Sequence, residues 1–359
     1  MSGRWTLPPL APGDMAPDFR GVSRPNPKFH FSTAAGRYVL MGFLPRDPSR
    51  REAAYAAVRP LFQVCERQSA AIFLIVPQTI EEGAPPDRHG VRWFFDPAEE
   101  IRQLYHVGPE GGWALLDPAM RVMALAPLEA PGPVLDRFAN LPSVDDYAGV
   151  PLVAPALIVP RVFEPEMCRR LIDIYEKVGG QQSGVMRDIG GRTVGVIDSM
   201  KRRRDVNLGS DKAMIAEIHA RIERTVVPMI ARAYQFRPTR IERYIVACYD
   251  AADGGYFMPH RDNETLGTAH RRFACSINLN AEEFEGGDLR FPELGRRTYR
   301  PPTGGAVVFA CNLQHEATPV TRGRRYAFLP FLYDEAGQAI RDRNAAFIES
   351  AGPSEQAAS

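Results

Sequence analysis

The sequence predicts a two-domain protein, with an α/β domain in the N-terminal half and an α+β domain built on an antiparallel jelly roll in the C-terminal half. The chain has 359 residues, and hydrophobic cores usually stop growing at roughly 100–200 residues per domain. Strand-like and helix-like segments alternate in residues 1–140, whereas short β-rich runs separated by turn residues follow one another from residue 240 onward.

The N-terminal half contains two apolar runs with the character of buried strands, RYVLMGFLP (residues 37–45) and SAAIFLIVPQ (residues 69–78). Such short runs are typical of a sheet covered on both faces. We predict helices over residues 51–68 and 96–107, and a strand over residues 113–127. The first helix places on one face the side chains of Tyr55, Val58, Leu61, Phe62 and Cys65.

This half resembles a peroxiredoxin, the thiol-peroxidase branch of the thioredoxin fold. The similar segments are GDMAPDF, GRYVLMGFLPRD, FFDPAEEIRQLYHV and ALLDPAMRV, spread in this order over residues 13–122. The resemblance implies a thioredoxin-like α/β domain over residues 1–140.

The reactive cysteine of that family is missing from this chain. A thiol peroxidase needs a thiolate at a helix N-terminus, where free backbone N–H groups lower the cysteine pKa. The segment after Pro45, RDPSRREAAY, contains no cysteine, and Glu52 stands at the corresponding position. Cys65 lies deep in the predicted helix and is expected in the core. We therefore expect a redox-inactive domain that serves as a scaffold, a dimerisation surface or a substrate-docking module.

Residues 141–155 are predicted to be a linker, because the surrounding NLPSVDDYAGVPLVAPAL has neither a helical nor a strand period and contains three prolines. Two helices follow, over residues 163–178 and 211–234. His219 lies near the charged side of the second helix and is expected in solvent. Apolar residues recur at helical spacing in the first helix, at Met167, Leu171, Ile172 and Tyr175.

The β-rich runs of the C-terminal half are joined by short connections, which favours antiparallel pairing in a jelly roll with the preceding helices on one outer face. The runs are RIERYIVACYD (240–250), RFACSINLNA (272–281), GDLRFPE (287–293), GGAVVFAC (304–311) and RRYAFLPFLYD (324–334).

The segment YFMPHRDN (residues 256–263) admits three interpretations: a metal-ligand pair, a kinase-like catalytic loop or a polar turn. A kinase also needs a Gly-rich phosphate loop, a strand lysine and a DFG-type aspartate, and none accompanies this segment. In a strand, His260 and Asp262 would face the same side, and Arg261 the other. Two histidines and one carboxylate form the facial triad of iron(II) oxygenases, so a third ligand is required.

His315 is the best candidate for that ligand among seven histidines. His30, His89 and His106 lie in the first domain, and His270 follows Asp262 closely in a charged turn. We expect His315 at the end of the strand GGAVVFACNLQH, approaching the metal from across the barrel.

Arg325 lies ten residues beyond His315, where the last strong strand begins. An arginine that points into an apolar barrel needs an anion, and a guanidinium binds a carboxylate through two hydrogen bonds. A dicarboxylate cosubstrate would chelate iron through its keto-acid end and reach Arg325 with its distal carboxylate. A register shift of one residue would exchange Arg325 for Arg324.

Residues 156–340 resemble the prolyl 4-hydroxylase branch of the iron(II)/2-oxoglutarate dioxygenases, with residues 341–359 as a C-terminal tail. The similar segments are IVACYDAADGGYFMPHRDN, SINLN, EGGDLRFPE and HEATPVTRGRRYAFLPFLYD. The resemblance implies that His260, Asp262 and His315 are iron ligands, and that Arg325 and Tyr249 bind 2-oxoglutarate. The implied cofactors are Fe(II), 2-oxoglutarate and O2, with ascorbate as reductant. The resemblance also places the basic run KRRRDVNL (residues 201–208) near the mouth of the site, where Arg203 or Arg204 could contact the substrate. Such a run is usually a solvated loop.

The amino-acid composition limits the kinds of binding partner that we expect. The 44 basic and 43 acidic residues nearly cancel, so nothing favours nucleic acid or anionic lipid. No signal peptide or membrane span is expected, and the scattered cysteines lack a disulfide pattern. We expect a cytoplasmic protein, with a homodimer through its N-terminal domain as one arrangement.

The resemblance implies hydroxylation of an unactivated C–H bond. Two substrate classes stay open: a prolyl or other side chain of a protein or peptide, and a free amino acid or other small metabolite. A third interpretation is a binding protein responsive to 2-oxoglutarate or oxygen, in which turnover is incidental.

Overall fold

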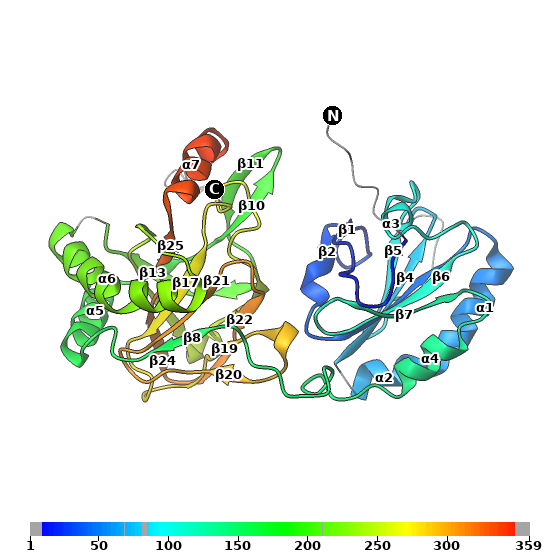
Figure 1. Ribbon diagram of the computed structural model, residues 1–359, viewed down its shortest axis with the longest axis horizontal. Helices are drawn as coiled ribbons and strands as arrows, with labels where there is room; N and C mark the ends of the chain where they lie inside the picture. Colours follow the sequence, from blue (N-terminus) through cyan, green and yellow to red (C-terminus); the bar gives the residue numbers. More distant parts are fainter. Residues whose placement is uncertain (1–8, 68, 81–84, 210, 349–359) are drawn as a thin grey trace, which may run out of the picture. The chain divides into compact units, whose positions relative to one another are not determined.

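The computed structural model describes residues 9–67, 69–80, 85–209 and 211–348 (Figure 1). The chain divides into two compact units. One comprises Met1–Val153 with Pro292–Arg296, and the other Ala154–Phe291 with Arg297–Ser359. The described residues from 140 to 156 contain no helix or strand.

The N-terminal unit contains a five-stranded sheet with the strand order β5-β4-β3-β6-β7. The strands β5, β4 and β3 run parallel to one another. β6 pairs antiparallel with β3, and β7 pairs antiparallel with β6. Every residue of β3 and β4 is buried, as predicted for a sheet covered on both faces. The strands are β3 (Tyr38–Phe43), β4 (Ala70–Val76), β5 (Val91–Phe95), β6 (Gly112–Leu116) and β7 (Val122–Pro127).

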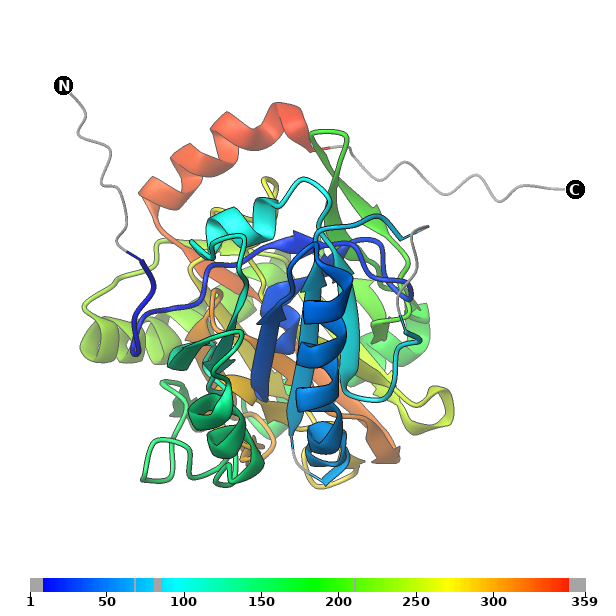
Figure 2. The same ribbon diagram turned by 90° about the vertical axis from the view of Figure 1, so that its right-hand side faces the viewer.

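One face of this sheet packs against the helices α1 (Pro48–Val58), α2 (Phe62–Arg67) and α4 (Gly132–Ala139). Figures 1 and 2 show α1 and α4 on the same side of the sheet. The other face packs against α3 (Glu100–Leu104) and the segment that contains β1 (Arg20–Gly21) and β2 (Phe29–His30). The unit is thus an α/β domain, while its relation to the thioredoxin fold stays a prediction.

Two predicted elements of this unit are wrong in detail. The helix over residues 51–68 is interrupted by a 3-10 turn, Arg59–Leu61, because Pro60 has no N–H and disrupts an α-helix. The strand over residues 113–127 is a hairpin of β6 and β7. Its turn closes through the hydrogen bond from Met120 N to Asp117 O. Neither β5 nor α4 was anticipated.

The C-terminal unit contains two antiparallel sheets of the jelly-roll type. The larger has the strand order β14-β25-β17-β24-β15-β13-β9, with β21 beside β17 and β8 beside β21. Its strands are β8 (Leu157–Val159), β9 (Gln181–Gln182), β13 (Arg204–Asn207), β14 (Arg240–Glu242), β15 (Ile245–Asp250), β17 (Phe273–Asn278), β21 (Ala306–Ala310), β24 (Arg324–Phe328) and β25 (Phe331–Tyr333).

The smaller sheet has the order β12-β16-β22-β19-β20. Two two-stranded ribbons, β10–β11 and β18–β23, complete the unit. Bounds are β10 (Val185–Ile189), β11 (Arg192–Val196), β12 (Lys201–Arg202), β16 (Tyr256–His260), β18 (Glu285–Gly286), β19 (Leu289–Arg290), β20 (Thr298–Tyr299), β22 (His315–Ala317) and β23 (Val320–Arg322).

The helices α5 (Pro165–Val178) and α6 (Lys212–Tyr234) pack on the outer face of the larger sheet (Figure 1), as predicted. The buried residues Leu171 and Ile222 belong to this core together with Val246 and Phe328 of the sheet. Alternate residues of the same strands, Tyr249 and Arg325 among them, line a cavity on the opposite face. The helices thus cover only the outer face of the sheet, and the polar side chains of Tyr249 and Arg325 lie on its inner face.

Several predicted β runs are divided between two strands. The run 240–250 breaks after Glu242, where Arg243 has a left-handed φ of 65°. The run 324–334 breaks at Leu329–Pro330, since proline cannot donate to a ladder. β21 ends at Ala310, and His315 instead begins β22 in the other sheet.

The helix α7 (Glu335–Asn344) crosses the boundary at residue 341 that we predicted for the tail. Residues 349–359 of that tail lie outside the described residues. Among the described residues, no helix is long and apolar enough to cross a membrane.

Candidate active site

Three side chains that could hold a metal ion meet where β16 and β22 pair. His260 ends β16 and lies opposite His315, the first residue of β22, while Asp262 follows two residues after His260. The Asp262 carboxylate lies 3.6 Å from His260 Nε2 and 3.3 Å from His315 Nε2. One ligand atom from each residue lies within 4.8 Å of the others. The sequence therefore identified the three residues that the fold brings together.

The predicted route of the third residue was wrong. We expected His315 to approach from across the barrel, but it lies on the strand next to β16. Asp262 is also not within the strand, because β16 ends at His260. The Asp262 N–H donates to Cys311 O at 2.9 Å, which directs this residue toward the loop before His315.

Backbone carbonyls orient both imidazoles. Nδ1 of His260 lies 2.8 Å from Met258 O, and Nδ1 of His315 lies 3.0 Å from Leu313 O. Each Nδ1 therefore carries the proton and donates it, which leaves the Nε2 lone pair for a metal. The ring of Phe257 stacks on His260 at 3.5 Å and restricts its rotation.

Electrostatics favour the protonation states that a metal needs. Burial, followed by the neighbouring His315, lowers the pKa of His260 to about 4. Burial alone would raise the pKa of Asp262, but the two imidazoles hold that pKa well below its usual range. Near neutral pH His260 is thus neutral and Asp262 is ionised. Two imidazoles and one carboxylate are a donor set that fits Fe(II) with open coordination positions.

Arg325 lies in the same cavity as His260, Asp262 and His315, with only 3% of its surface exposed. Its Nη2 donates to Ser276 Oγ at 2.8 Å, and it lies 3.4 Å from Asn278 Oδ1. Within the described residues it forms no ion pair. A buried guanidinium that is bound only by neutral groups favours an anion as its missing partner.

Tyr249 lies beside Arg325 on the neighbouring strand. The two residues are paired between β15 and β24, and the guanidinium lies 5.2 Å from the centre of the Tyr249 ring. By contrast, Arg324 points outward and pairs with Asp250 at 2.9 Å. The structure therefore places Arg325, not Arg324, in the cavity.

The basic run at residues 201–204 is not a solvated loop. It enters β12 and β13, where side chains alternate between faces: Lys201 and Arg203 are buried, and Arg202 and Arg204 are exposed. Arg203 pairs with Asp205 at 2.6 Å and lies 3.4 Å from the Tyr249 hydroxyl.

Lys201, which we had not singled out, also lines the cavity. Its Nζ donates to Ser183 Oγ at 2.7 Å and to Gly184 O at 2.8 Å. Burial lowers its pKa to about 6. All four residues of KRRR are basic, so the sequence carries no hydrophobic alternation that would show which two point inward.

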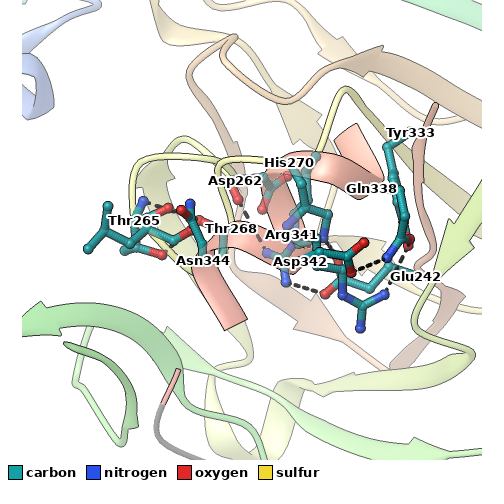
Figure 3. A network of polar contacts seen from close by, with 12 residues as sticks. Glu242, Asp262, Thr265, Thr268, His270, Tyr333, Gln338, Arg341, Asp342 and Asn344 are labelled. Carbon is teal, nitrogen blue, oxygen red and sulfur yellow. Dashed lines mark hydrogen bonds and ion pairs between the residues drawn. The ribbon is translucent and has the colours of Figure 1, made fainter. Parts of the chain in front are cut away.

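A buried ionic network supports the loop that carries Asp262. Arg271 donates to the main-chain carbonyl of Asp262 at 3.2 Å and forms two hydrogen bonds with Glu242, at 3.0 and 2.7 Å. His270 lies 2.7 Å from the same carboxylate. Figure 3 shows Asp262, His270 and Glu242 beside α7, where Arg341 reaches Tyr333.

The remaining histidines do not join the cluster. His270 lies in a turn, as predicted, and it is buried 2.7 Å from Glu242. His219 is 46% exposed, 3.8 Å from Glu223, as predicted for the surface of α6. In the N-terminal unit, Cys65 is buried as predicted and Glu52 is exposed.

Comparison with protein families matches residues 244–333 to the 2OG-Fe(II) oxygenase superfamily. A PKHD-type hydroxylase from Synechococcus sp. (strain JA-2-3B'a(2-13)) is 29% identical over 117 residues, which cover 30% of this chain and 51% of the relative. One from Pseudomonas fluorescens is 34% identical over 98 residues, covering 25% and 42%. The chain spans about half the length of the curated relatives that it matches first.

Solved structures give a weaker similarity. A prolyl hydroxylase from Trichoplax adhaerens, in complex with a hypoxia inducible factor peptide fragment, has a TM-score of 0.40 at 16% identity, covering 52% of this chain and 87% of that one. A Pseudomonas putida prolyl-4-hydroxylase has a TM-score of 0.36 at 16% identity, covering 53% and 96%. The match of residues 244–333 includes all three clustered residues, and the C-terminal region of this chain is similar to 2OG-Fe(II) oxygenases and to PKHD-type hydroxylases.

Proposed function

We propose that the C-terminal unit is an Fe(II)- and 2-oxoglutarate-dependent dioxygenase that hydroxylates an unactivated C–H bond. One observation carries this proposal: His260, Asp262 and His315 converge in a cavity that also holds Arg325, a buried guanidinium without a carboxylate partner. The three residues would hold the metal, and Arg325 would bind the distal carboxylate of 2-oxoglutarate. Tyr249 would support that end through its hydroxyl.

The protein's own part in such a reaction is binding and orientation. When bound, iron(II), 2-oxoglutarate and O2 supply the oxidation, with succinate and CO2 as coproducts. The carbonyl of Met258 and the ring of Phe257 hold His260 in one orientation. Leu289, Phe309 and Phe331 contribute apolar walls to the cavity, which exclude water from the reacting atoms.

A prolyl or other side chain of a protein or peptide is our first choice of substrate, supported by the similarity to PKHD-type hydroxylases. A free amino acid or other small metabolite is the second. We include ascorbate as reductant and a cytoplasmic setting in the proposal.

We further propose that the N-terminal unit is a thioredoxin-like domain that has lost peroxidase chemistry and serves in docking or dimerisation. Its support is the buried Cys65 and the exposed Glu52 on α1. The full chain should consume no hydrogen peroxide beyond buffer controls. Peroxide consumption that Cys65→Ser removes would contradict this part of the proposal.

The enzyme proposal is tested by product formation. Purified protein supplied with Fe(II), ascorbate, O2 and 2-oxoglutarate should form succinate, and His260→Ala and Asp262→Ala should abolish it. Arg261→Ala is the matched control, because Arg261 lies between the two ligands and does not belong to the cluster. Wild-type protein that binds neither Fe(II) nor 2-oxoglutarate would refute the proposal.

A further inference from the structure

Arg243 is a second arginine of the active-site cavity for which the proposed chemistry gives no partner. It lies in the break between β14 and β15 and lines the same cavity as His260 and Asp262. Its backbone has a φ of 65°, in the left-handed region that non-glycine residues rarely adopt. Such strained residues concentrate at functional sites, and this one places a guanidinium at the cavity wall.

The Arg243 guanidinium contacts an aromatic ring and has no polar partner among the described residues. It lies 4.5 Å from the centre of the Phe331 ring, and its Nε is buried without a hydrogen bond. In the part of the chain that the structure describes, Arg243 forms neither a hydrogen bond nor an ion pair. Since buried donors are rarely left unpaired in native proteins, a ligand is the natural partner for this group.

The neighbouring carboxylates are already engaged. Glu242 accepts hydrogen bonds from Arg271, and Asp205 from Arg203. Asp262 belongs to the metal cluster. Arg271 gives the contrast: it also lies over Phe331, at 4.0 Å, but its charge is matched by Glu242.

When a divalent metal and 2-oxoglutarate occupy the site, Arg243 is again left without a counter-charge. A divalent metal, the Asp262 carboxylate, the two carboxylates of 2-oxoglutarate and Arg325 balance one another, and Arg203 is balanced by Asp205. Lys201 already donates to Ser183 and Gly184. Among the described residues, Arg243 is therefore the cation of the cavity that is left with neither a hydrogen bond nor a counter-charge.

We propose that Arg243 binds a carboxylate of the substrate that is hydroxylated, and so selects acidic substrates. This inference rests on the proposed function, because it assigns the metal and the 2-oxoglutarate to the rest of the cavity. The carboxylate belongs either to the C-terminus of a free amino acid or peptide, or to an acidic side chain next to the hydroxylated residue. Both sources present the same planar group to the guanidinium.

The test is binding of matched probes to the full chain loaded with Zn(II) and 2-oxoglutarate, which cannot turn over. The first pair is N-acetyl-L-proline and its primary amide, and the second is capped Pro-Asp and Pro-Asn dipeptides, all measured by calorimetry. We expect the acidic member of at least one pair to bind about tenfold more tightly than its neutral partner. The pair that shows the preference identifies the source of the carboxylate.

Variants then assign the preference to one residue. Arg243→Gln should abolish it, and Arg243→Lys should retain part of it. Arg224→Gln, on the exposed surface of α6, should leave it unchanged. Arg243→Gln removes no hydrogen bond or ion pair from the described part of the chain, so its melting temperature should not fall. Arg243→Lys provides a second variant if it does.

Two results would overturn the proposal: equal binding of both members in both pairs, including no binding of any probe up to about 50 mM, or an acidic preference that survives Arg243→Gln. Calorimetry of Zn(II) and 2-oxoglutarate is recorded first. Failure at that step would count against the proposed function, and failure with the probes alone would count against the role of Arg243.

Discussion

Replacing Arg325 with methionine should weaken 2-oxoglutarate binding without lowering the stability of the ligand-free protein. Arg325 is buried beside Ser276 and Asn278 with no carboxylate partner. Two charge-assisted hydrogen bonds to the cosubstrate, at about 1.5 kcal/mol or more each, predict an increase of roughly a hundredfold in its Kd. Without ligand, the variant loses a costly buried cation and a hydrogen bond to Ser276 worth about 1 kcal/mol. Its melting temperature should therefore not fall.

The assay is calorimetric titration of the metal-loaded protein with 2-oxoglutarate, together with thermal melting in its presence and absence. Arg324→Met is the matched control, because Arg324 is the adjacent residue on β24, is half exposed, and pairs with Asp250 of the neighbouring strand β15. The control should bind 2-oxoglutarate as the wild type does. An unchanged Kd in Arg325→Met, or a large loss of stability without ligand, would refute the assignment of Arg325 to an anion.

Three further predictions concern the surroundings of the site. Folding lowers the pKa of His260 from 6.5 to about 4, so between these pH values the unfolded chain binds more protons than the folded one. The free energy of unfolding of the metal-free protein, measured in urea, should therefore rise with pH across this window. A fall would contradict the lowered pKa of His260. Glu242→Gln leaves Arg271 buried and unpaired, which should cost about 3–5 kcal/mol in urea unfolding, and Glu242→Gln with Arg271→Met should recover much of that loss; an unaffected single variant would show that the network contributes little. Gly287→Ala, at φ 67°, places a Cβ 2.7 Å from Val320 and 3.2 Å from Arg325, so it should displace Arg325 and weaken 2-oxoglutarate binding several-fold. The control Gly191→Ala, at φ 78° with open space around it, should not weaken binding. Equal effects of the two variants would show that displacement of Arg325 is not the cause.

The sequence predicted best those features that depend on local pattern. The apolar runs of β3 and β4, the amphipathic period of α5 and the spacing of His260 and Asp262 are all local. His315 could be predicted because the chain has only seven histidines. Arg325 could be predicted because an arginine in a buried strand needs an anionic partner.

The features that the sequence did not predict depend on contacts between distant segments. Glu242 and Arg271 are 29 residues apart along the chain, and neither lies in a motif. The route of His315 depended on where β21 ends and β22 begins, which turn residues between two sheets decide. In the β10–β11 ribbon, apolar and polar residues do not alternate regularly, and only Val185 and Thr193 are buried, so it carried no clear hydrophobic period.

Anaerobic calorimetry of Fe(II) binding, with 2-oxoglutarate present, tests the central claim most directly. We predict one Fe(II) per chain in the wild type, no measurable site in Asp262→Ala, and unchanged binding in Arg261→Ala. An Asp262→Ala variant that still binds one Fe(II) with wild-type affinity would contradict the assignment of His260, Asp262 and His315 as the metal centre.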